Sequence, residues 1–292
     1  MEYIEKLMQE VDKNVRELVD VFRFLLRYKV LFRGTGIEFA GLREYVLGED
    51  DASRIDWKAS LRSKRLYVKQ YEEERELDVY ILLDTSVSML FGTQEKLKSE
   101  YAAVVAGTLA YAAIESGDNV GFGMFSDKVL VSLPPVGDIS QYYNILRLTV
   151  DPRFYGGGCN INETLSYTVN SIEEKTVLFI ISDFIGIGDE WEDSLKMACG
   201  KFNTVFGIMI RDIRDSTLPE GVGNMRFSDP FSDKVLVVNV DKIRKDFERF
   251  TKKQESRIEK IFIESGAGFV KVYTHEPFVK PIARYLQLTA IY

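Results

Sequence analysis

The stretch DVYILLDTSVSM at residues 78–89 decides the fold. Its apolar run is typical of a strand that is buried on both faces of a parallel sheet. The run ends in the carboxylate of Asp84, and the hydroxyl side chains of Ser86 and Ser88 follow at alternate positions. Because ligands bind beyond the carboxyl ends of strands in open α/β sheets, these three residues are the first candidate site residues. Their oxygens supply about half of the shell that Mg²⁺ accepts, with water completing roughly six ligands.

The rest of the chain alternates between strand-like and helix-like stretches. Alternating units of this kind predict a mostly parallel sheet that is covered by helices on both faces. We therefore expect an α/β domain over residues 77–292, preceded by an extension over residues 1–76 with a helix and short strands. A hairpin is expected around residues 226–240. The other expected strands are 120–125, 129–133, 177–181, 205–210 and 268–273, and the expected helices include 139–148, 161–169, 191–200 and 242–263.

The first thirty residues carry a helical pattern. Apolar side chains recur at spacings of three and four, which places them on one stripe of a helix that packs on the domain. The stripe consists of Val11, Val15, Leu18, Val19, Phe22, Leu25 and Leu26.

Composition restricts the class of protein. The chain has 292 residues, of which 46% are hydrophobic and 28% charged, as expected for a globular protein with a sizeable core. The most apolar N-terminal segment, residues 19–32, is interrupted by Arg23, Arg27 and Lys29, so we expect no membrane span and a cytoplasmic protein. Two cysteines and one histidine give neither a disulfide framework nor a zinc site. The net charge of -7 argues against nucleic acid as a partner.

Asp-x-Ser-x-Ser after an apolar strand resembles the metal-ion-dependent adhesion site of von Willebrand factor A-like domains. That family completes its site with a threonine in a Gly-rich loop and with an aspartate after the fourth strand. Here the loop reads GGGCN at residues 156–160, and Asp183 follows an apolar run. The resemblance implies a Rossmann-like von Willebrand factor A-type sheet and a site for Mg²⁺, or for Mn²⁺ or Ca²⁺. Its implied metal ligands are Asp84, Ser86, Ser88 and Asp183.

The sequence departs from that pattern at Cys159, which stands where the family has its threonine. A thiol is a poor ligand for hard Mg²⁺, so we expect weak binding, for which the amide oxygen of Asn160 could compensate. Two other interpretations stay open. Asp84 and Asp183 could cap turns around a metal-free site, or Cys159 could act as a nucleophile, although the only histidine, His275, lies on the final expected strand.

A second resemblance lies in the segment before the domain. The motifs GTGIEF at 34–39, LREY at 42–45 and RIDWK at 54–58, with RDIRDSTLPEG at 211–221, resemble the family called domain of unknown function 58. Members of that family are commonly encoded beside MoxR-type AAA+ ATPases, which implies an adaptor role in chaperone-like assembly or maturation. We interpret five residues of the segment as either a buried network or an interaction surface: Arg43, Glu44, Asp56, Trp57 and Lys58.

Two functional classes follow from these residues. In the first, the protein is a non-enzymatic interaction module whose metal site holds an acidic residue of a protein partner. In the second, a hydrolase or phosphoryl-transfer enzyme uses a metal at Asp84 and Asp183 as a Lewis acid. Related aspartyl-phosphate enzymes place a second aspartate where this chain has Ser86, and no phosphate-cradling Gly-x-x-x-x-Gly-Lys motif is present. Binding is therefore the favoured function, and we expect no enzyme activity.

Overall fold

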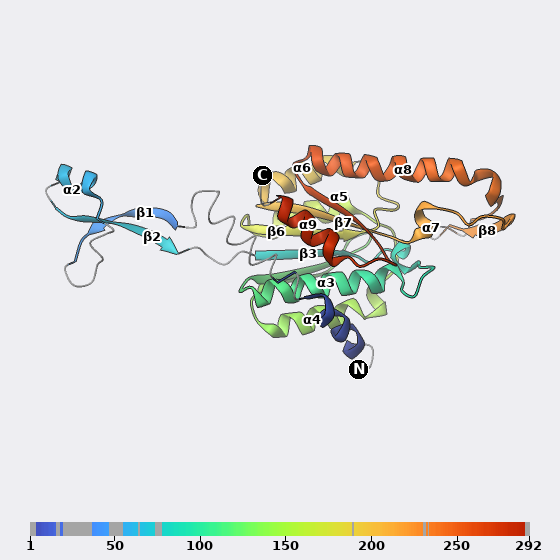
Figure 1. Ribbon diagram of the computed structural model, residues 1–292, viewed down its shortest axis with the longest axis horizontal. Helices are drawn as coiled ribbons and strands as arrows, with labels where there is room; N and C mark the ends of the chain where they lie inside the picture. Colours follow the sequence, from blue (N-terminus) through green and yellow to red (C-terminus); the bar gives the residue numbers. More distant parts are fainter. Residues whose placement is uncertain are drawn as a thin grey trace.

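A six-stranded sheet forms the centre of the protein. The computed structural model describes residues 4–15, 18–19, 37–46, 55–63, 65–73, 78–188, 190–229, 232 and 234–289. The order of the strands in the sheet is β10-β7-β6-β3-β4-β5, and only β5 runs antiparallel to its neighbour (Figure 1). The strands are β3 (Asp78–Asp84), β4 (Asn119–Phe125), β5 (Val129–Val136), β6 (Thr176–Ser182), β7 (Thr204–Arg211) and β10 (Gly268–Tyr273).

Helices cover both faces of this sheet, because its central strands are apolar on both sides. Val79, Ile81 and Leu83 of β3 belong to one core, and Tyr80 and Leu82 belong to the other. The first core is covered by α3 (Lys98–Glu115), α4 (Ile139–Thr149) and α9 (Val279–Thr289), and the second by α5 (Ile161–Ser171), α6 (Glu192–Lys201) and α8 (Val240–Glu264). The predicted mostly parallel sheet flanked by helices is confirmed. Its assignment to the von Willebrand factor A type stays a prediction.

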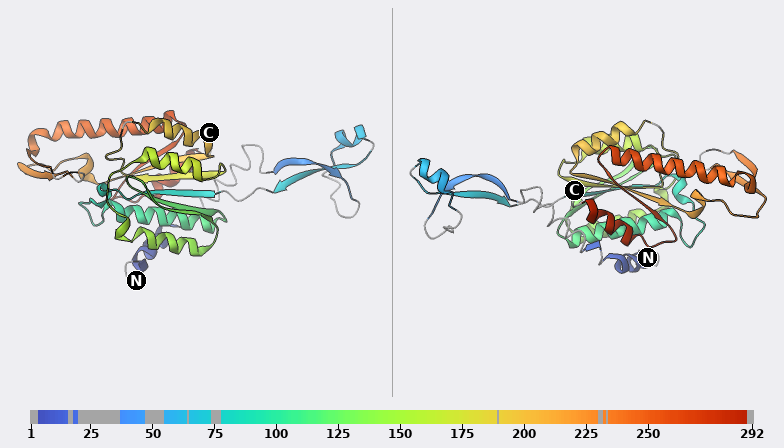
Figure 2. Two further views of the ribbon diagram at one scale, coloured as in Figure 1. Left: turned by 180° about the vertical axis from the view of Figure 1, so that it is seen from behind. Right: turned by 45° about the horizontal axis from the view of Figure 1, so that its top comes forward.

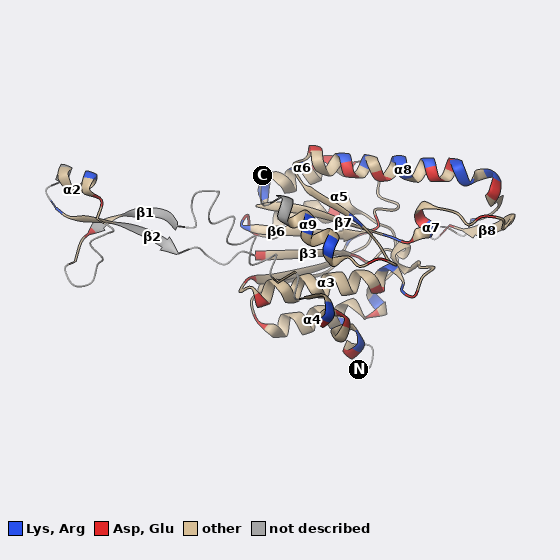
Figure 3. Ribbon diagram, in the orientation of Figure 1, with Lys and Arg blue, Asp and Glu red and all other residues tan. Residues whose placement is uncertain are grey.

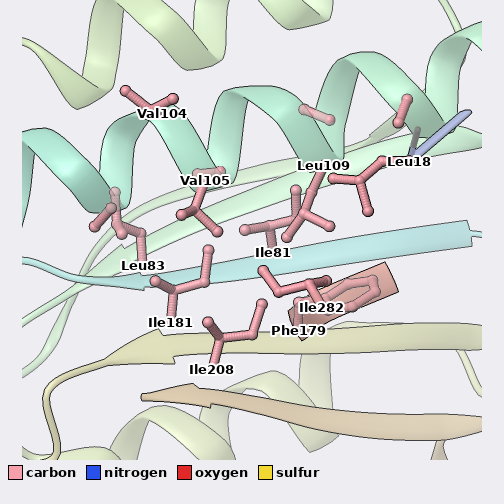
Figure 4. Close-up of a cluster of buried hydrophobic side chains, with 14 of the residues drawn as sticks. Leu18, Ile81, Leu83, Val104, Val105, Leu109, Phe179, Ile181, Ile208 and Ile282 are labelled. Atoms are coloured by element: carbon pink, nitrogen blue, oxygen red, sulfur yellow. The ribbon is translucent and has the colours of Figure 1, made fainter. Parts of the chain in front are cut away.

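Figure 4 shows how the first core is filled. Side chains of β3 meet Val105 and Leu109 of α3 on one side and Phe179 and Ile181 of β6 on the other. Ile282 of α9 closes the same core. This continuous apolar packing holds β3 and β6 rigidly side by side, so that their carboxyl ends are fixed with respect to each other.

The N-terminal helix, residues 4–15, packs on the first core as its apolar stripe predicts. Val11, Val15, Leu18 and Val19 are buried there with residues of α3 and α4. A Cβ at Gly107 of α3 would lie 2.9 Å from Leu146 Cδ2 and 3.0 Å from Val11 Cγ2, so this glycine lets the N-terminal helix pack closely on α3. The predicted members of the stripe at Phe22, Leu25 and Leu26 lie outside the described residues. The division of the chain at residues 76 and 77 stays a prediction.

A small unit of two strands and a helix lies in the N-terminal extension. β1 (Ile37–Glu44) pairs antiparallel with β2 (Tyr67–Glu73), and α2 (Trp57–Ser63) lies between them in the sequence. Alternating apolar and polar residues over 66–71 predict a strand at the position of β2, whereas no strand is expected from the sequence at its partner β1. Asp56 begins the helix, because its Oδ1 accepts hydrogen bonds from the backbone N–H groups of Lys58 and Ala59.

A second hairpin follows the fifth strand of the main sheet. The short helix α7 (Ile213–Ser216) leads into β8 (Asn224–Ser228) and β9 (Val235–Asn239), which pair antiparallel, as predicted for residues 226–240. The long helix α8 begins directly after β9 and carries charges of both signs along its length (Figure 3). Figure 1 and Figure 2 show this orange hairpin projecting beyond the end of the sheet where β3 and β7 terminate.

Candidate functional site

The predicted site residues meet at the carboxyl edge of the sheet. Asp84 ends β3 and Asp183 directly follows β6, its parallel neighbour, so the two carboxylates lie on adjacent strands. The chain then turns through a short 3-10 helix, η2 (Val87–Leu90), which keeps Ser86 and Ser88 beside them. Ser86 is fixed by its backbone N–H, which donates to Asp84 Oδ1 at 2.8 Å. The structure therefore brings all four side chains together.

Three oxygens of this cluster are linked by consecutive hydrogen bonds. Ser86 Oγ lies 3.0 Å from Ser88 Oγ, and Ser88 Oγ donates to Asp183 Oδ1 at 3.1 Å. The same carboxylate oxygen also accepts the backbone N–H of Ile185 at 2.9 Å. All three side chains are buried, so the spacing of their oxygens is fixed by the surrounding fold.

Asp84 lies deeper in the same cluster and has a perturbed acidity. Burial and the neighbouring charge of Asp183 raise the pKa of Asp84 to about 6, while hydrogen bonds from Ser182 and Ser86 act in the opposite direction. Ser182 Oγ donates to Asp84 Oδ2 at 2.5 Å. Asp84 is thus held by donors on both of its oxygens.

The thiol of Cys159 also faces Asp84. Its Sγ donates to Asp84 Oδ2 at 3.4 Å, and burial together with the nearby carboxylates raises the pKa of the thiol far above its usual range. Because a nucleophilic cysteine needs a thiolate, this environment argues against nucleophilic catalysis by Cys159. The neighbouring Asn160 uses its amide oxygen to accept the backbone N–H of Glu163 at the start of α5. That oxygen already has a partner, and its role as a compensating ligand stays a prediction.

A buried lysine that sequence analysis missed completes the site. Lys98 begins α3, and its Nζ lies 2.7 Å from Asp183 Oδ2 and 2.9 Å from Asp215 Oδ2. Burial raises the pKa of Asp215, and the charge of Lys98 opposes that rise. Nothing in the local sequence marks Lys98, because Lys96 two residues earlier has the same character but pairs with the partly exposed Glu10. Asp215 lies in a segment that carries a family resemblance, which is the only signal the sequence offers for it.

The charges in this cluster do not balance when all groups are ionised. Asp84, Asp183 and Asp215 supply three carboxylates, against the ammonium of Lys98, with the buried Arg211 also acting on Asp215. A buried excess of negative charge is costly unless a proton or a cation neutralises it. Burial is the main cause of the raised pKa of Asp84, and the charge of Asp183 adds to it. A divalent cation would neutralise the same excess without protonating Asp84.

The oxygens suit a small divalent cation in spacing and in chemistry. Mg²⁺ binds octahedrally at about 2.1 Å, so adjacent ligands lie about 3.0 Å apart. The observed separations of 3.0 Å between Ser86 Oγ and Ser88 Oγ, and of 3.1 Å between Ser88 Oγ and Asp183 Oδ1, match that edge length. Within the described part of the chain, no three His, Cys, Asp or Glu side chains gather as a metal site. An ion here would therefore depend on the two serine hydroxyls.

The Gly-rich loop closes the site from one side. Gly156 N–H donates to Thr85 O at 2.9 Å, and Val87 N–H donates to Gly157 O at 3.1 Å, so the loop is tied to the turn after β3. Gly157 has a φ of 76°, and a Cβ there would lie 2.5 Å from Asp127 Oδ1. Glycine is therefore required at that position.

An apolar rim lies beside the closed cluster. Leu90 and Phe91, at the end of η2, are both exposed, and Lys98 Nζ lies 5.5 Å from the centre of the Phe91 ring. These side chains are the nearest exposed apolar groups on the turn that carries Ser86 and Ser88. The rim therefore offers a contact surface directly next to the buried oxygens.

The candidate interaction residues of the N-terminal extension lie on the β1–α2–β2 unit. Trp57 is 62% exposed and Lys58 is also exposed, which excludes a buried network at these two residues. Glu44 and Arg65 form an exposed ion pair at 2.8 Å, and Asp56 caps α2. The side chain of Arg43 lies outside the described residues. Of the two interpretations given above, a surface role fits Trp57 and Lys58.

The fold and site define a mostly parallel α/β protein with a buried cluster of carboxylates and hydroxyls at the carboxyl edge of its sheet. The chain belongs to the DUF58 family, described as a protein of unknown function, and residues 41–257 match it. Uncharacterised proteins of Mycobacterium tuberculosis and Mycobacterium bovis are 25% identical to it over 262 residues, which cover 88% of this chain and 80% of theirs.

Two solved structures share the fold. The conserved hypothetical protein BatB of Bacteroides thetaiotaomicron has a TM-score of 0.52 at 18% identity, and covers 74% of this chain and 100% of its own. An aerotolerance-related membrane protein of Bacteroides fragilis has a TM-score of 0.52 at 18% identity, with 73% of this chain and 99% of its own covered. Across the residues that the structure describes here, no helix is both long and apolar enough to span a membrane.

Proposed function

We propose that this protein is a non-enzymatic interaction module in which the cluster at Asp84, Ser86, Ser88 and Asp183 holds a divalent cation. The observation that carries the proposal is that Ser88 Oγ lies 3.0 Å from Ser86 Oγ and 3.1 Å from Asp183 Oδ1, two separations compatible with adjacent ligands of an octahedral Mg²⁺ shell. The cation would supply an open coordination position for an acidic side chain of a protein partner. The thiol of Cys159 stays outside the shell as a donor to Asp84.

Electrostatics support an acidic partner despite the negative charge of the chain. A bound divalent ion is the largest local charge in such a site and reverses its sign for an approaching ligand. Lys98 already neutralises part of the charge of Asp183 and Asp215, which leaves less negative charge to repel an incoming carboxylate. The exposed Leu90 and Phe91 would contact the apolar surroundings of that carboxylate.

The environment of the reactive groups supports binding rather than catalysis. Cys159 is a buried, protonated donor, and both oxygens of Asp84 are engaged by hydrogen bonds. A general base must lie within reach of a substrate, and the carboxylate of Asp84 is fully buried. A role as adaptor for a MoxR-type AAA+ ATPase, which the family resemblance implies, fits an interaction module of this kind.

A retention experiment from native lysate tests this function. Immobilised wild-type protein is compared with Asp84→Ala in Mg²⁺ and in chelator, and a MoxR-type AAA+ ATPase is identified by mass spectrometry. Ser171→Ala is the matched control, because Ser171 is an exposed serine at the end of α5. We expect retention by wild type and by the control only with Mg²⁺. Retention that ignores both chelator and Asp84→Ala would contradict a metal-bridged contact.

A further inference from the structure

Strand β9 exposes an unusual amount of apolar surface for an edge strand. Leu236 is 64% exposed and Val237 is 67% exposed, and the preceding Val235 is exposed as well. Consecutive residues of a strand point to opposite faces, so β9 is apolar and open on both sides. Proteins usually protect an edge strand with charges, prolines or bulges, and β9 itself has none of these.

Among the described residues, β8 is the only strand that pairs with β9, so β9 has an open edge. Asp229 N–H donates to Lys234 O at 3.0 Å, and Val240 N–H donates to Gly223 O at 2.8 Å, at the two ends of the ladder with β8. Hydrogen-bonded positions alternate along an antiparallel pair. Residues 236 and 238 therefore direct their N–H and C=O groups toward β8, and Val235, Val237 and Asn239 direct theirs away from it.

A ribbon of two five-residue strands is marginal in water on its own. A third strand beside β9 would pair with the outward backbone groups and place its own side chains next to those of Val235 and Val237. β8 does not offer a comparable edge, because its outward positions carry the exposed Asn224, Arg226 and Ser228. An added strand is therefore expected at β9 alone.

We propose that β9 pairs antiparallel with β9 of a second copy of this chain, so that two hairpins form one four-stranded sheet. The strand is self-complementary in that arrangement. With Val237 on the two-fold axis beside its own copy, Val235 lies opposite Asn239 and Leu236 lies opposite Val238, so no charge meets a like charge. The polar edge of β8 ends the sheet on both sides, and the assembly closes as a dimer.

The size of the contact makes this dimer weak and reversible. Strands of five residues bury less than the roughly 1,000 Å² expected of a stable interface. The dimer is therefore expected only at high protein concentration. Each dimer would carry two candidate sites, one from each copy. The hairpin projects beyond the same carboxyl edge of the sheet at which each site lies (Figure 1). This pairing does not depend on the function proposed for those sites.

Sedimentation velocity of the full chain over a wide concentration range tests the pairing. Val237→Pro removes an outward N–H without touching the ladder between β8 and β9, and Val237→Lys keeps the N–H but places like charges together on the axis. Val222→Lys, at an exposed valine outside the strand, is the matched control. We expect both Val237 variants to lower the association constant at least tenfold and the control to leave it unchanged.

Hydrogen exchange gives a second readout that does not depend on how a variant folds. In the wild type, the amides of Val235, Val237 and Asn239 should become more protected as concentration rises, while those of Val222 should not. A chain that stays monomeric over the whole range would overturn the proposal. So would a dimer whose association constant is the same in Val237→Pro, or exchange at Val237 that is independent of concentration.

Discussion

The Nζ atom of Lys98 lies 2.7 Å from Asp183 Oδ2 in the interior of the protein, where neither side chain reaches solvent. The same ammonium contacts Asp215 Oδ2 at 2.9 Å, so one lysine on α3 joins the end of β6 to α7. This ion pair sets the charge of the candidate site. Because the ion pair is buried, its loss can be measured by protein unfolding as well as by ligand binding.

Replacing Lys98 should lower the free energy of unfolding of the protein in the absence of metal. Lys98→Met removes the ammonium that faces the buried Asp183 and the partly buried Asp215, and removal of one member of a buried pair costs about 3–5 kcal/mol. The loss is measured by urea unfolding in chelator. Mg²⁺ should restore part of it, because a cation at Asp183 replaces the missing charge.

Lys96→Met is the control for that measurement. Lys96 pairs with Glu10, and both side chains are partly exposed, so the expected loss is at most about 1 kcal/mol. Equal losses for the two variants would show that the Lys98 contacts carry no special weight.

Asp84 should make stability depend on pH in a defined direction. Its pKa in the folded protein, about 6, lies above the ordinary value of 3.8 for an aspartate, so the folded state binds more protons between these values. Stability from this group is fully present below about pH 4 and is lost as pH rises through 6. The shift corresponds to about 3 kcal/mol at most.

Comparison with Asp84→Asn isolates that effect, because the variant cannot titrate at this position. In chelator, the unfolding free energy of the wild type minus that of the variant should fall as pH rises from 4 to 7. A difference that stays flat, or that grows, would mean that Asp84 is ionised in the native site throughout this range.

Replacing Cys159 with threonine should tighten Mg²⁺ binding. A threonine hydroxyl is a hard ligand that would enter the shell from which the Cys159 thiol stays out, and a gain of about 1.4 kcal/mol corresponds to tenfold in affinity. Cys199→Thr serves as control, because Cys199 is a half-buried cysteine on α6. Calorimetry that gives an unchanged or weaker affinity for Cys159→Thr would refute this role for position 159.

The Gly-rich loop should tolerate alanine at one glycine and not at its neighbour. Gly157→Ala places a Cβ 2.5 Å from Asp127 Oδ1 at a positive φ, with an expected cost of about 1–3 kcal/mol. Gly158→Ala meets no atom within 4 Å and should be close to neutral. Thermal unfolding of the two variants separates them, and equal midpoints would contradict the loop geometry.

The sequence predicts the sheet and the meeting of Asp84 with Asp183 because both signals are local. Each carboxylate ends an apolar run, and parallel strands bring such ends to one edge. Lys98 escapes prediction because its partners are 85 residues away at Asp183 and on α7 at Asp215, and no local pattern marks a lysine that will be buried.

The N-terminal unit shows a different limit. The turn residues around β1 give no local signal for a strand. Its pairing with β2 depends on a register that distant residues set. Trp57 belongs to a family motif, and the motif does not reveal whether the indole is buried. In the structure the indole is exposed, because Asp56 caps helix α2 and Trp57, the first residue of that helix, faces outward.

A calorimetric titration with Mg²⁺ tests the central proposal most directly. Wild type, Ser88→Ala and the control Ser171→Ala are compared, because Ser88 Oγ lies between the two other oxygens of the proposed shell. We predict that wild type and Ser171→Ala each bind one Mg²⁺ per chain, and that Ser88→Ala binds it at least about tenfold more weakly, a loss of about 1.4 kcal/mol. Absence of Mg²⁺ binding by the wild type, or equal affinity in Ser88→Ala, would contradict a metal site at this edge of the sheet.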